Sequence, residues 1–199
     1  MNPRSAGYVT GRATKADIVD KAFHVFAESG YEGTSLREIA RRCGINHATL
    51  LHHFPKKSLL LMAVLEHRDE IQHIEPKTLE ESLGLLLGIA VRNEETPGLV
   101  RLFTLLAAEA SDPDHPARHY FQERGAYVRG LIADHIVLAQ GRGELPTTLD
   151  AETTATNLIA LWEGLQLQAP LRADVSIAGQ LGAAFDALVG RPVRPILLD

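Results

Sequence analysis

Two short amphipathic segments separated by a tight turn constrain the fold of this chain most strongly. Residues 35–43, SLREIARRC, carry apolar side chains at i, i+3, i+4 and i+7, which is the pattern of one face of a short helix. Ser35 and Glu38 have capping-box spacing, and Gly44 is expected to end the helix. Asn46 can cap a second helix almost at once. The segment therefore predicts a helix-turn-helix motif.

Helical periodicity continues along the chain, and no stretch shows sustained strand alternation. We expect a first helix from near Thr14 to Gly30 and a fourth helix from about Lys56 towards Gln72. Five more helices are predicted at residues 79–93, 97–111, 116–140, 150–168 and 175–189. The sequence thus predicts an all-α fold, in which a three-helix helix-turn-helix DNA-binding domain is fused to a larger helical bundle.

Capping signals support several of these boundaries. Pro55 is expected to end the third helix because a proline lacks an amide proton. Pro97 and Pro116 are predicted at first helical positions, where that missing proton costs nothing. Asp150 is a good N-cap, and Gly190 is expected to close the last helix.

The predicted elements divide the chain into three parts. Residues 1–13 are expected to form a flexible N-terminal arm, and residues 14–58 the helix-turn-helix domain. Residues 59–199 would form a larger helical domain, for which the family resemblance given below implies a regulatory and dimerisation role. A linking helix over residues 56–72 would join the two domains.

The charge distribution points to a polyanionic partner for the N-terminal part alone. The whole chain has 20 Lys and Arg against 25 Asp and Glu, a net charge of −5 that by itself argues against nucleic-acid binding. Residues 1–60, however, contain nine basic and five acidic side chains. A basic segment on an acidic body is typical of a protein that binds nucleic acid through one domain.

Other features of the sequence indicate a cytoplasmic protein. No apolar run is long enough for a membrane span, and no apolar segment of a secretory signal follows the N-terminus. The single cysteine, Cys43, excludes an intramolecular disulfide. Its place on the apolar face of a helix predicts core packing.

Packing of the first three helices decides which side chains of the third helix face outward. We predict that Leu50 and Phe54 are buried, and that four side chains are exposed: His47, Ala48, Leu51 and His52, with Thr49 and His53 at the margins. In a helix-turn-helix the N-terminal part of this helix enters the major groove. Histidine can hydrogen-bond base edges there, and Ala or Leu can pack on a thymine methyl group.

Flanking residues are candidates for contacts with the DNA backbone. Thr34 and Ser35 lie at the start of the preceding helix, where amides and hydroxyls suit a phosphate oxygen. Lys56 and Lys57 flank the exit of the third helix. Three arginines add positive charge, although the last two could equally be solvated surface residues: Arg37, Arg41 and Arg42.

The residues from about Thr14 to Leu65 resemble the N-terminal domain of TetR-type transcriptional repressors. The stretch FAESGYEGTSLREIARRCGINHATLLHHFPKKSLL carries the glycines, caps and apolar positions of that family. The resemblance implies a two-domain, all-α homodimer. It also implies that a recognition helix at residues 46–53 contacts operator DNA, while the larger helical body binds a small molecule and dimerises.

The resemblance carries over roles for single residues. Lys57 matches a lysine that contacts phosphate, while His52 and His53 match positions near bases or backbone. His47 lies in a variable base-contacting position. Leu51 departs from the family, which usually has a backbone-contacting Tyr there, so it carries over only as an apolar base contact. The predicted DNA-binding residues are Thr34, Ser35, Arg37, Asn46, His47, Ala48, Thr49, Leu51, His52, His53 and Lys57.

In the C-terminal part, two residue sets are candidates for further sites. Aromatic and polar side chains that could line a ligand cavity, or simply fill a bundle core, are Phe103, Tyr120, Tyr127, Trp162 and Gln166. The last two helices carry more apolar area than one face needs, which predicts a two-fold dimer interface. The residues expected there are Leu158, Leu161, Leu165, Leu181, Phe185 and Leu188.

Metal binding and enzyme catalysis are the other functions to consider. His115 and His119 have i, i+4 spacing with Asp112 nearby, so they could hold a metal ion or could simply begin a solvated helix. The sequence has no nucleophile elbow, glycine-rich phosphate loop or HExxH motif. We therefore expect no catalytic residue, no resident metal and no cofactor.

The sequence as a whole predicts a ligand-responsive transcriptional repressor. It would bind a palindromic double-stranded DNA operator as a homodimer, and an unidentified small-molecule effector would release it. A DNA-binding regulator without an inducer and a metal-responsive sensor are the alternatives.

Overall fold

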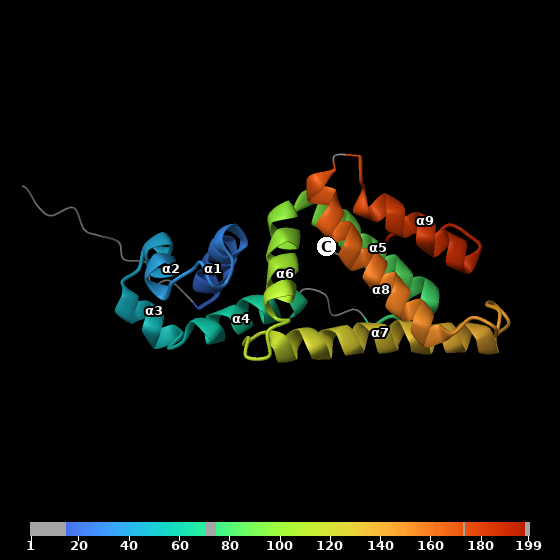
Figure 1. Ribbon diagram of the computed structural model, residues 1–199, viewed down its shortest axis with the longest axis horizontal. Coiled ribbons are helices and arrows are strands. Elements are labelled where there is room, and N and C mark those ends of the chain that lie inside the picture. Colours follow the sequence, from blue (N-terminus) through green and yellow to red (C-terminus); the bar gives the residue numbers. More distant parts are fainter. Residues whose placement is uncertain (1–14, 71–74, 173, 198–199) are drawn as a thin grey trace, which may run out of the picture. The chain divides into compact units, whose positions relative to one another are not determined.

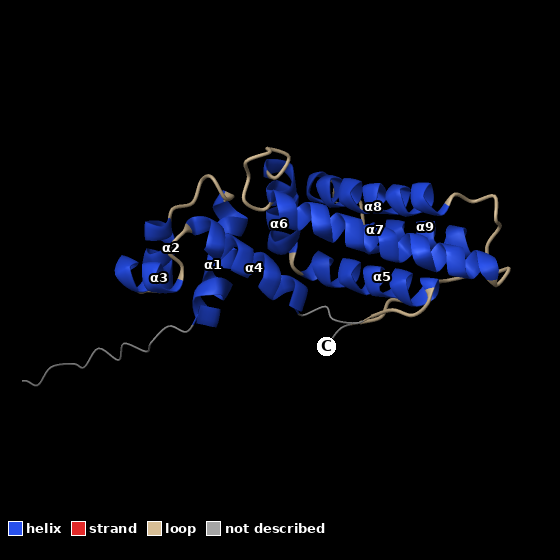
Figure 2. Ribbon diagram, turned by 90° about the horizontal axis from the view of Figure 1, so that it is seen from below, coloured by secondary structure: helices blue, strands red, loops and turns tan. Residues whose placement is uncertain are grey.

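The computed structural model describes residues 15–70, 75–172 and 174–197. Within these ranges every regular element is helical (Figure 2), which confirms the predicted all-α fold. The chain divides into two compact units within helix α4, between His67 and Arg68. The predicted arm at residues 1–13, the helix start at Thr14 and the helix end near Gln72 lie outside the described residues.

The N-terminal unit, up to His67, is built from four short helices (Figure 1). These are α1 (Lys15–Ser29), α2 (Leu36–Cys43), α3 (His47–His53) and α4 (Lys57–Glu70), the last of which continues into the second unit. Helix α2 contacts both α1 and α3. The core contains fully buried Phe26, Ile39, Leu50 and Leu60, so each helix of this unit contributes a large apolar side chain. The predicted domain boundary at residues 58 and 59 lies earlier in the same helix α4.

Caps fix the two helices of the helix-turn-helix in the predicted way. The Ser35 hydroxyl accepts the Glu38 amide at 3.2 Å, and the Asn46 side-chain oxygen accepts the Thr49 amide at 2.7 Å. Between them, Gly44 has a φ of 69°, a left-handed conformation that favours glycine. Its amide donates to carbonyls at the end of α2 and closes that helix.

The C-terminal unit, from Arg68 onward, is a bundle of longer helices. After α4 they are α5 (Leu79–Glu95), α6 (Pro97–Glu109), α7 (Arg118–Gly141), α8 (Ala151–Gln168), the 3₁₀ turn η1 (Ala169–Leu171) and α9 (Ile177–Val189). Helix α5 packs against α7 and α9, and α8 packs against α6, α7 and α9 (Figure 1). Leu83, Ile136 and Phe185 lie in the core that these contacts enclose. No described helix combines the length and apolar character needed to cross a membrane.

Two boundaries in this unit bear directly on the predicted caps. Asp150 does cap α8, accepting the Thr153 amide at 2.8 Å, and this bond together with the Thr153 hydroxyl lowers the pKa of Asp150. The prediction that Pro116 begins a helix is wrong, because α7 starts at Arg118. The Ala117 amide instead donates to His115 Nδ1 at 3.2 Å, so a side chain satisfies the backbone group and the chain turns once more before the helix begins.

The segment after α9 returns across α5, where two glycines allow a close approach. The Ile196 amide donates to the Gly84 carbonyl at 2.8 Å. A Cβ atom at Gly84 would lie 2.8 Å from the Arg194 carbonyl oxygen, and one at Gly88 would overlap the Ile196 carbonyl. Since only glycine leaves room for this crossing, the two positions hold the C-terminal segment against the bundle.

We predict that Gly88→Ala destabilises the protein by about 1–3 kcal/mol, because the added methyl group must displace a backbone carbonyl. Gly130→Ala is the matched control, since it is also a helical glycine but its added Cβ meets nothing within 4 Å. It should be neutral or stabilising by up to about 1 kcal/mol. Urea unfolding of both variants tests this, and equal unfolding midpoints would contradict the close approach.

Candidate nucleic-acid interface and ligand cavity

Helix α3 presents most of its surface outward. Of its seven residues only Leu50 is buried. Ala48 and His52 are exposed, while His47 and Leu51 are half-buried. Because a single apolar side chain anchors the helix, the other positions are left to form a protruding ridge. The predicted margin residues Thr49 and His53 are also half-buried.

Three of the predicted DNA-binding residues already make structural bonds. Thr34 is only 4% exposed, and its hydroxyl donates to the Gly30 carbonyl at 2.7 Å. This corrects the expectation that its hydroxyl contacts phosphate, because a buried hydroxyl used within the turn cannot reach a ligand. Ser35 and Asn46 are exposed, but each uses its side-chain oxygen as a helix cap.

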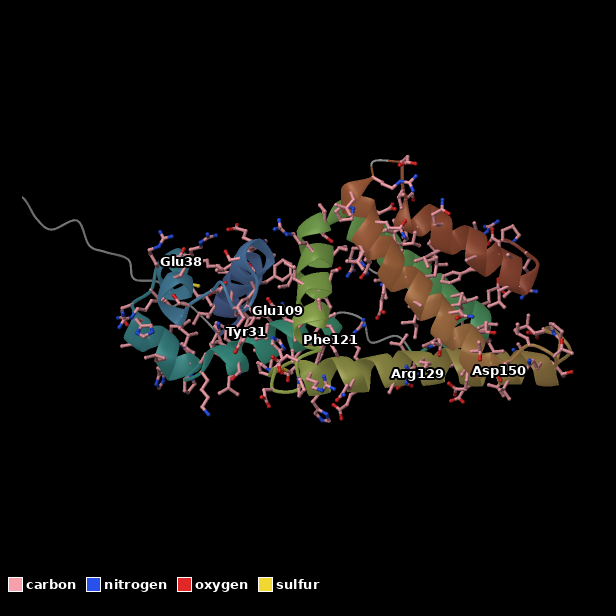
Figure 3. The ribbon with its side chains drawn as sticks, in the orientation of Figure 1. Tyr31, Glu38, Glu109, Phe121, Arg129 and Asp150 are labelled. Carbon is pink, nitrogen blue, oxygen red and sulfur yellow. The ribbon has the colours of Figure 1, made fainter. Side chains whose placement is uncertain are left out.

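The arginines at the end of α2 are held in an ion-pair network. Arg41 binds Glu38 through two hydrogen bonds of 2.9 and 2.6 Å, and Arg42 binds the same carboxylate at 3.0 Å. Arg42 also pairs with Glu28 of α1. The bonds from Arg41 and then Arg42 lower the pKa of Glu38 from 4.5 to about 2 (Glu38 is labelled in Figure 3). Carboxylates therefore offset much of this positive charge within the unit, and these two arginines are ion-paired surface residues.

Lys57 lies at the start of α4 and is tied to the turn between α1 and α2. Its ammonium donates to the carbonyls of Tyr31 at 2.8 Å and Thr34 at 3.0 Å. It also lies 4.0 Å from the centre of the Tyr31 ring, a cation–π contact (Tyr31 is labelled in Figure 3). An ammonium has three donors, so two are committed to the fold and one is left for any phosphate. The phosphate contact predicted for Lys57 stays a prediction.

Two other cations of the unit are available to a ligand. Arg37 and Lys56 are exposed and make no hydrogen bond or ion pair among the described residues. The sequence offered Lys56 as a flanking candidate, although the family resemblance carried a phosphate contact over only to Lys57. The sequence shows two adjacent lysines, and only the structure reveals that Lys57 turns inward while Lys56 stays exposed.

Cys43 is buried on the inner face of α2, as its spacing predicted. Burial raises the pKa of its thiol. A thiol held in its protonated form in an apolar environment is a packing group rather than a reactive one.

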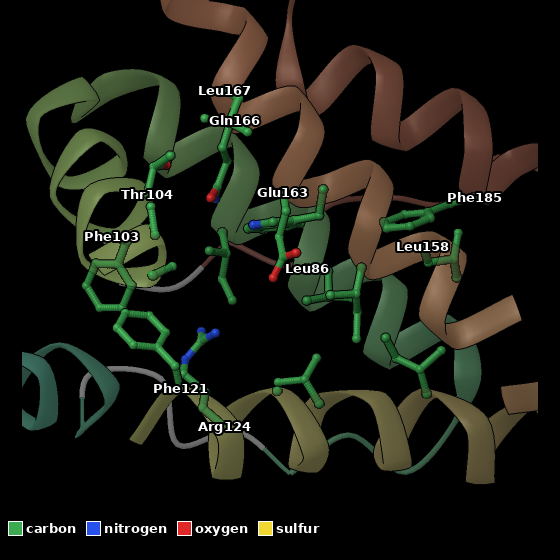
Figure 4. Close-up of a pocket in the computed structure, with 18 residues that line it drawn as sticks. Leu86, Phe103, Thr104, Phe121, Arg124, Leu158, Glu163, Gln166, Leu167 and Phe185 are labelled. Carbon is green, nitrogen blue, oxygen red and sulfur yellow. The ribbon is translucent and has the colours of Figure 1, made fainter. Parts of the chain in front are cut away.

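The C-terminal unit contains a cavity of about 470 Å³ between α5, α6, α7 and α8 (Figure 4). Its walls are mainly apolar and aromatic, and Phe103 and Phe121 meet edge to face with ring centres 5.9 Å apart. Arg124 of α7 and Glu163 of α8 point towards the cavity (Figure 4). A largely apolar enclosure with a few polar groups is typical of a small-molecule site.

Some of the residues predicted from the sequence to line a cavity do line this one. Phe103, Trp162 and Gln166 line it as predicted, whereas Tyr120 and Tyr127 do not. The Tyr127 side chain is 63% exposed, which corrects its assignment as a cavity residue. Arg124 and Glu163 were missed, because charged residues on a long helix carry no sequence signal that distinguishes a cavity from solvent.

The residues predicted for a dimer interface are mostly inside the unit. Leu165, Leu181 and Phe185 are 6%, 0% and 1% exposed and belong to the core, so they are not available to a second copy. Leu158 and Phe185 also line the cavity. Leu161 and Leu188 are half-buried against the core. The burial of Leu165, Leu181 and Phe185 in the bundle therefore argues against their contact with a second copy, and the interface itself stays a prediction.

The two histidines that might have shared a metal ion point to different partners. His119 is exposed and lies 3.1 Å from Glu123, while the buried His115 side chain lies 3.7 Å from Glu109. In the described part of the chain, no group of three or more potential ligand residues could hold a metal. The i, i+4 spacing therefore does not build a site here.

Two family models match the chain. Residues 18–64 match the N-terminal domain of bacterial regulatory proteins of the tetR family, and residues 102–185 match a tetracyclin repressor-like C-terminal domain. A related protein is the HTH-type transcriptional regulator SrpR of Pseudomonas putida, 29% identical over 94% of this chain and 90% of that protein. The HTH-type transcriptional repressor ComR of Escherichia coli is 27% identical over 76% of this chain and 77% of its own length.

Solved structures share the same fold. A TetR transcription regulator from Haloarcula marismortui superposes with a TM-score of 0.72 and 20% identity, covering 90% of this chain and 98% of that one. AibR, solved in complex with isovaleryl coenzyme A and operator DNA, gives a TM-score of 0.64 and 19% identity over 89% of this chain and 98% of its own.

We predict that Lys57→Met loosens the N-terminal unit by about 1–3 kcal/mol, because two carbonyls of buried residues lose their donor. Lys56→Met is the control, since it removes the neighbouring exposed charge and should change stability by no more than about 0.5 kcal/mol. Hydrogen exchange of the α2 amides measures this unit separately from the rest. Equal protection in the two variants would show that the Lys57 bonds do not stabilise the turn.

Proposed function

The chain belongs to the TetR family of bacterial regulatory proteins and is a DNA-binding transcriptional regulator, and we propose that it is a repressor released by a small molecule. The observation that carries the DNA-binding half of this proposal is the outward ridge of α3, anchored by Leu50 alone. Its exposed side chains, Ala48 and His52, would enter the major groove together with half-buried His47. Arg37 and Lys56, which have no hydrogen bond or ion pair within the described part of the chain, would contact the phosphates on either side.

The cavity of the C-terminal unit supports the ligand half of the proposal. Its volume and its apolar walls with few polar groups suit a small organic molecule. AibR, which shares the fold, was solved with an acyl coenzyme A and operator DNA together, and ComR is named a repressor. The two recognition helices of a dimer must be the right distance apart to enter successive major grooves. A ligand that binds more tightly to a conformation with a different distance would increase the population of that conformation and release the protein from DNA.

Selection of bound fragments from random double-stranded DNA tests the base contacts. The wild-type protein should select an inverted repeat whose half-sites are about one helical turn, roughly 34–36 Å, apart. His47→Ala should select a different base at one position of each half-site, with a preference changed by about 1–3 kcal/mol. Recovery of fragments without any shared sequence would contradict the proposal, and an unchanged preference in His47→Ala would remove that residue from the interface.

Phosphate contacts should respond differently. Arg37→Gln and Lys56→Gln should each weaken binding to every sequence alike, and lower the slope of log affinity against log salt by about 0.9. Fluorescence anisotropy at several salt concentrations measures both effects. A changed base preference with an unchanged salt slope would place these side chains at bases instead.

We also propose that the exposed faces of α8 and α9 form the homodimer interface. Helices α8 and α9 are neighbours in the bundle. The outer face of α9 carries Gly179, Ala183 and Ala187 at four-residue steps, and Ala160 is exposed on α8. Small side chains allow close approach of helices from a second copy, and a two-fold axis would bring the same face of each copy together.

Ala183→Arg should therefore shift the protein from dimer to monomer, because a charged, bulky side chain is placed at the centre of that face. Ala126→Arg on the exposed surface of α7 is the matched control and should leave the dimer intact. Sedimentation velocity distinguishes the two states. A dimer that survives Ala183→Arg but dissociates in the control would move the interface to α7.

A further inference from the structure

A second cavity, of about 740 Å³, lies beside the first at the end of α5, the start of α6 and the end of α8. The two cavities share Thr104, Gln166 and Leu167 as lining residues. Their chemical character differs. The walls of both are mainly apolar, but the aromatic side chains lie in the first, whereas the second is lined by Asn93, Glu94, Arg101 and Asp174.

The acidic groups of the second cavity are already engaged. Glu94 accepts the Ser176 hydroxyl at 2.9 Å and the Ala178 amide at 3.1 Å, so it caps the start of α9. Asp174 accepts from Arg172 at 2.7 Å, and that bond lowers the pKa of its carboxyl. Arg101 also lines this cavity, is exposed, and makes no ion pair or hydrogen bond among the described residues. Glu94 keeps its negative charge, which faces the positive end of α9, and Asp174 is paired with Arg172. Among the described charged residues that line the cavity, Arg101 is therefore the one without a hydrogen bond or ion pair.

The start of α6 adds donors to the same wall. Thr96 precedes the helix but does not cap it, because its hydroxyl donates to the Arg92 carbonyl at 3.1 Å. Pro97 and Gly98, the first residues of α6, line the cavity. Pro97 has no amide proton, so of these two residues Gly98 supplies the free amide donor, and the helix start adds the positive end of its dipole.

An independent observation points to a missing acceptor. Asn93, in the last turn of α5, lines this cavity and is only 2% exposed. Its side-chain Nδ2 is buried and has no hydrogen-bond partner within residues 15–70, 75–172 and 174–197. A buried donor left unsatisfied costs free energy, so the site is incomplete without an acceptor.

The first cavity sets the direction in which a ligand would lie. Arg124 and Glu163, which carry opposite charges, both point towards it, so their charges offset one another and give no net attraction for an anionic group there. The apolar walls, with Phe103 and Trp162, favour an uncharged body instead. An anionic end would therefore be directed past Gln166 towards Arg101.

We propose that the effector is an amphipathic organic anion that spans both cavities. Its apolar body would fill the first cavity, and its carboxylate or phosphate would lie in the second, near Arg101, the amides at the start of α6 and Asn93. This inference rests on the proposed function, because it concerns the ligand of the same regulatory unit.

Trp162 makes a direct test possible, because it is the chain's single tryptophan and lines the first cavity. Decanoate, decanol and decyltrimethylammonium present the same body with a negative, a neutral and a positive head group. Quenching of Trp162 fluorescence on titration with each gives its affinity. Decanoate should bind at least about tenfold more tightly than decanol, the difference expected for one charge-assisted hydrogen bond.

Variants then assign the head-group position. Arg101→Gln should weaken decanoate by about tenfold and leave decanol unchanged, while Arg101→Lys should retain most of the preference. Arg129→Gln removes a similar charge from α7 away from both cavities and should have no effect. Equal affinities for decanoate and decanol, tighter binding of the cation, a decanoate affinity insensitive to Arg101→Gln, or no quenching by any probe would overturn the inference.

Anisotropy of a labelled operator separates this inference from the function on which it rests. If decanoate binds as predicted but leaves the operator complex intact, the release mechanism fails and the ligand class stands. If decanoate shows no preference over decanol, the ligand class fails whatever happens to the operator.

Discussion

Burial of one leucine supports the DNA-facing surface of this protein. Helix α3 has seven residues, and a helix of that length is not stable alone in water. It persists because Leu50 enters the core with Ile39 and Phe26, and because Asn46 caps its start. The turn at Gly44 then fixes its direction relative to α2. With so little of α3 used for folding, its remaining side chains are free to differ between regulators without loss of the fold.

In the N-terminal unit, some basic side chains stabilise the fold through internal hydrogen bonds and ion pairs, whereas others are available to bind DNA. Glu38 draws Arg41 and Arg42 into a network on α2, and Lys57 closes the turn between α1 and α2. Each exposed ion pair contributes little to stability, but together they keep two arginines from acting as free cations. A count of basic residues therefore overstates the positive charge available to DNA. Arg37 and Lys56, which make no hydrogen bond or ion pair with any residue that the structure describes, give a better measure of that charge.

Features that depend only on neighbouring residues were mostly predicted correctly from the sequence. Features that depend on packing between segments far apart in the chain were not. Ser35, Asn46 and Asp150 each act on an amide three residues away, so their spacing alone identified the helix starts. The regular spacing of apolar residues in α8 and α9 was also recognisable in the sequence. This pattern does not show whether those residues pack within their own bundle or against a second copy of the chain. Leu181 and Phe185 proved to be core residues for this reason. The cavity was found only through its aromatic residues, since charged groups such as Glu163 resemble solvated ones in a sequence.

A sequence does not show which distant residues line the same cavity, so the charges around the proposed ligand site could be recognised only in the structure. Asn93 and Arg101 line one cavity, whereas Arg124 and Glu163, far away in the chain, point with opposite charges into the adjoining one. Each has an ordinary helical setting when considered alone. Glu94 accepts hydrogen bonds at the start of α9, so its carboxylate, although still charged, is engaged there and not in an ion pair with Arg101. A helix cap thus has a second consequence: by engaging one carboxylate it leaves a neighbouring cation available to a ligand.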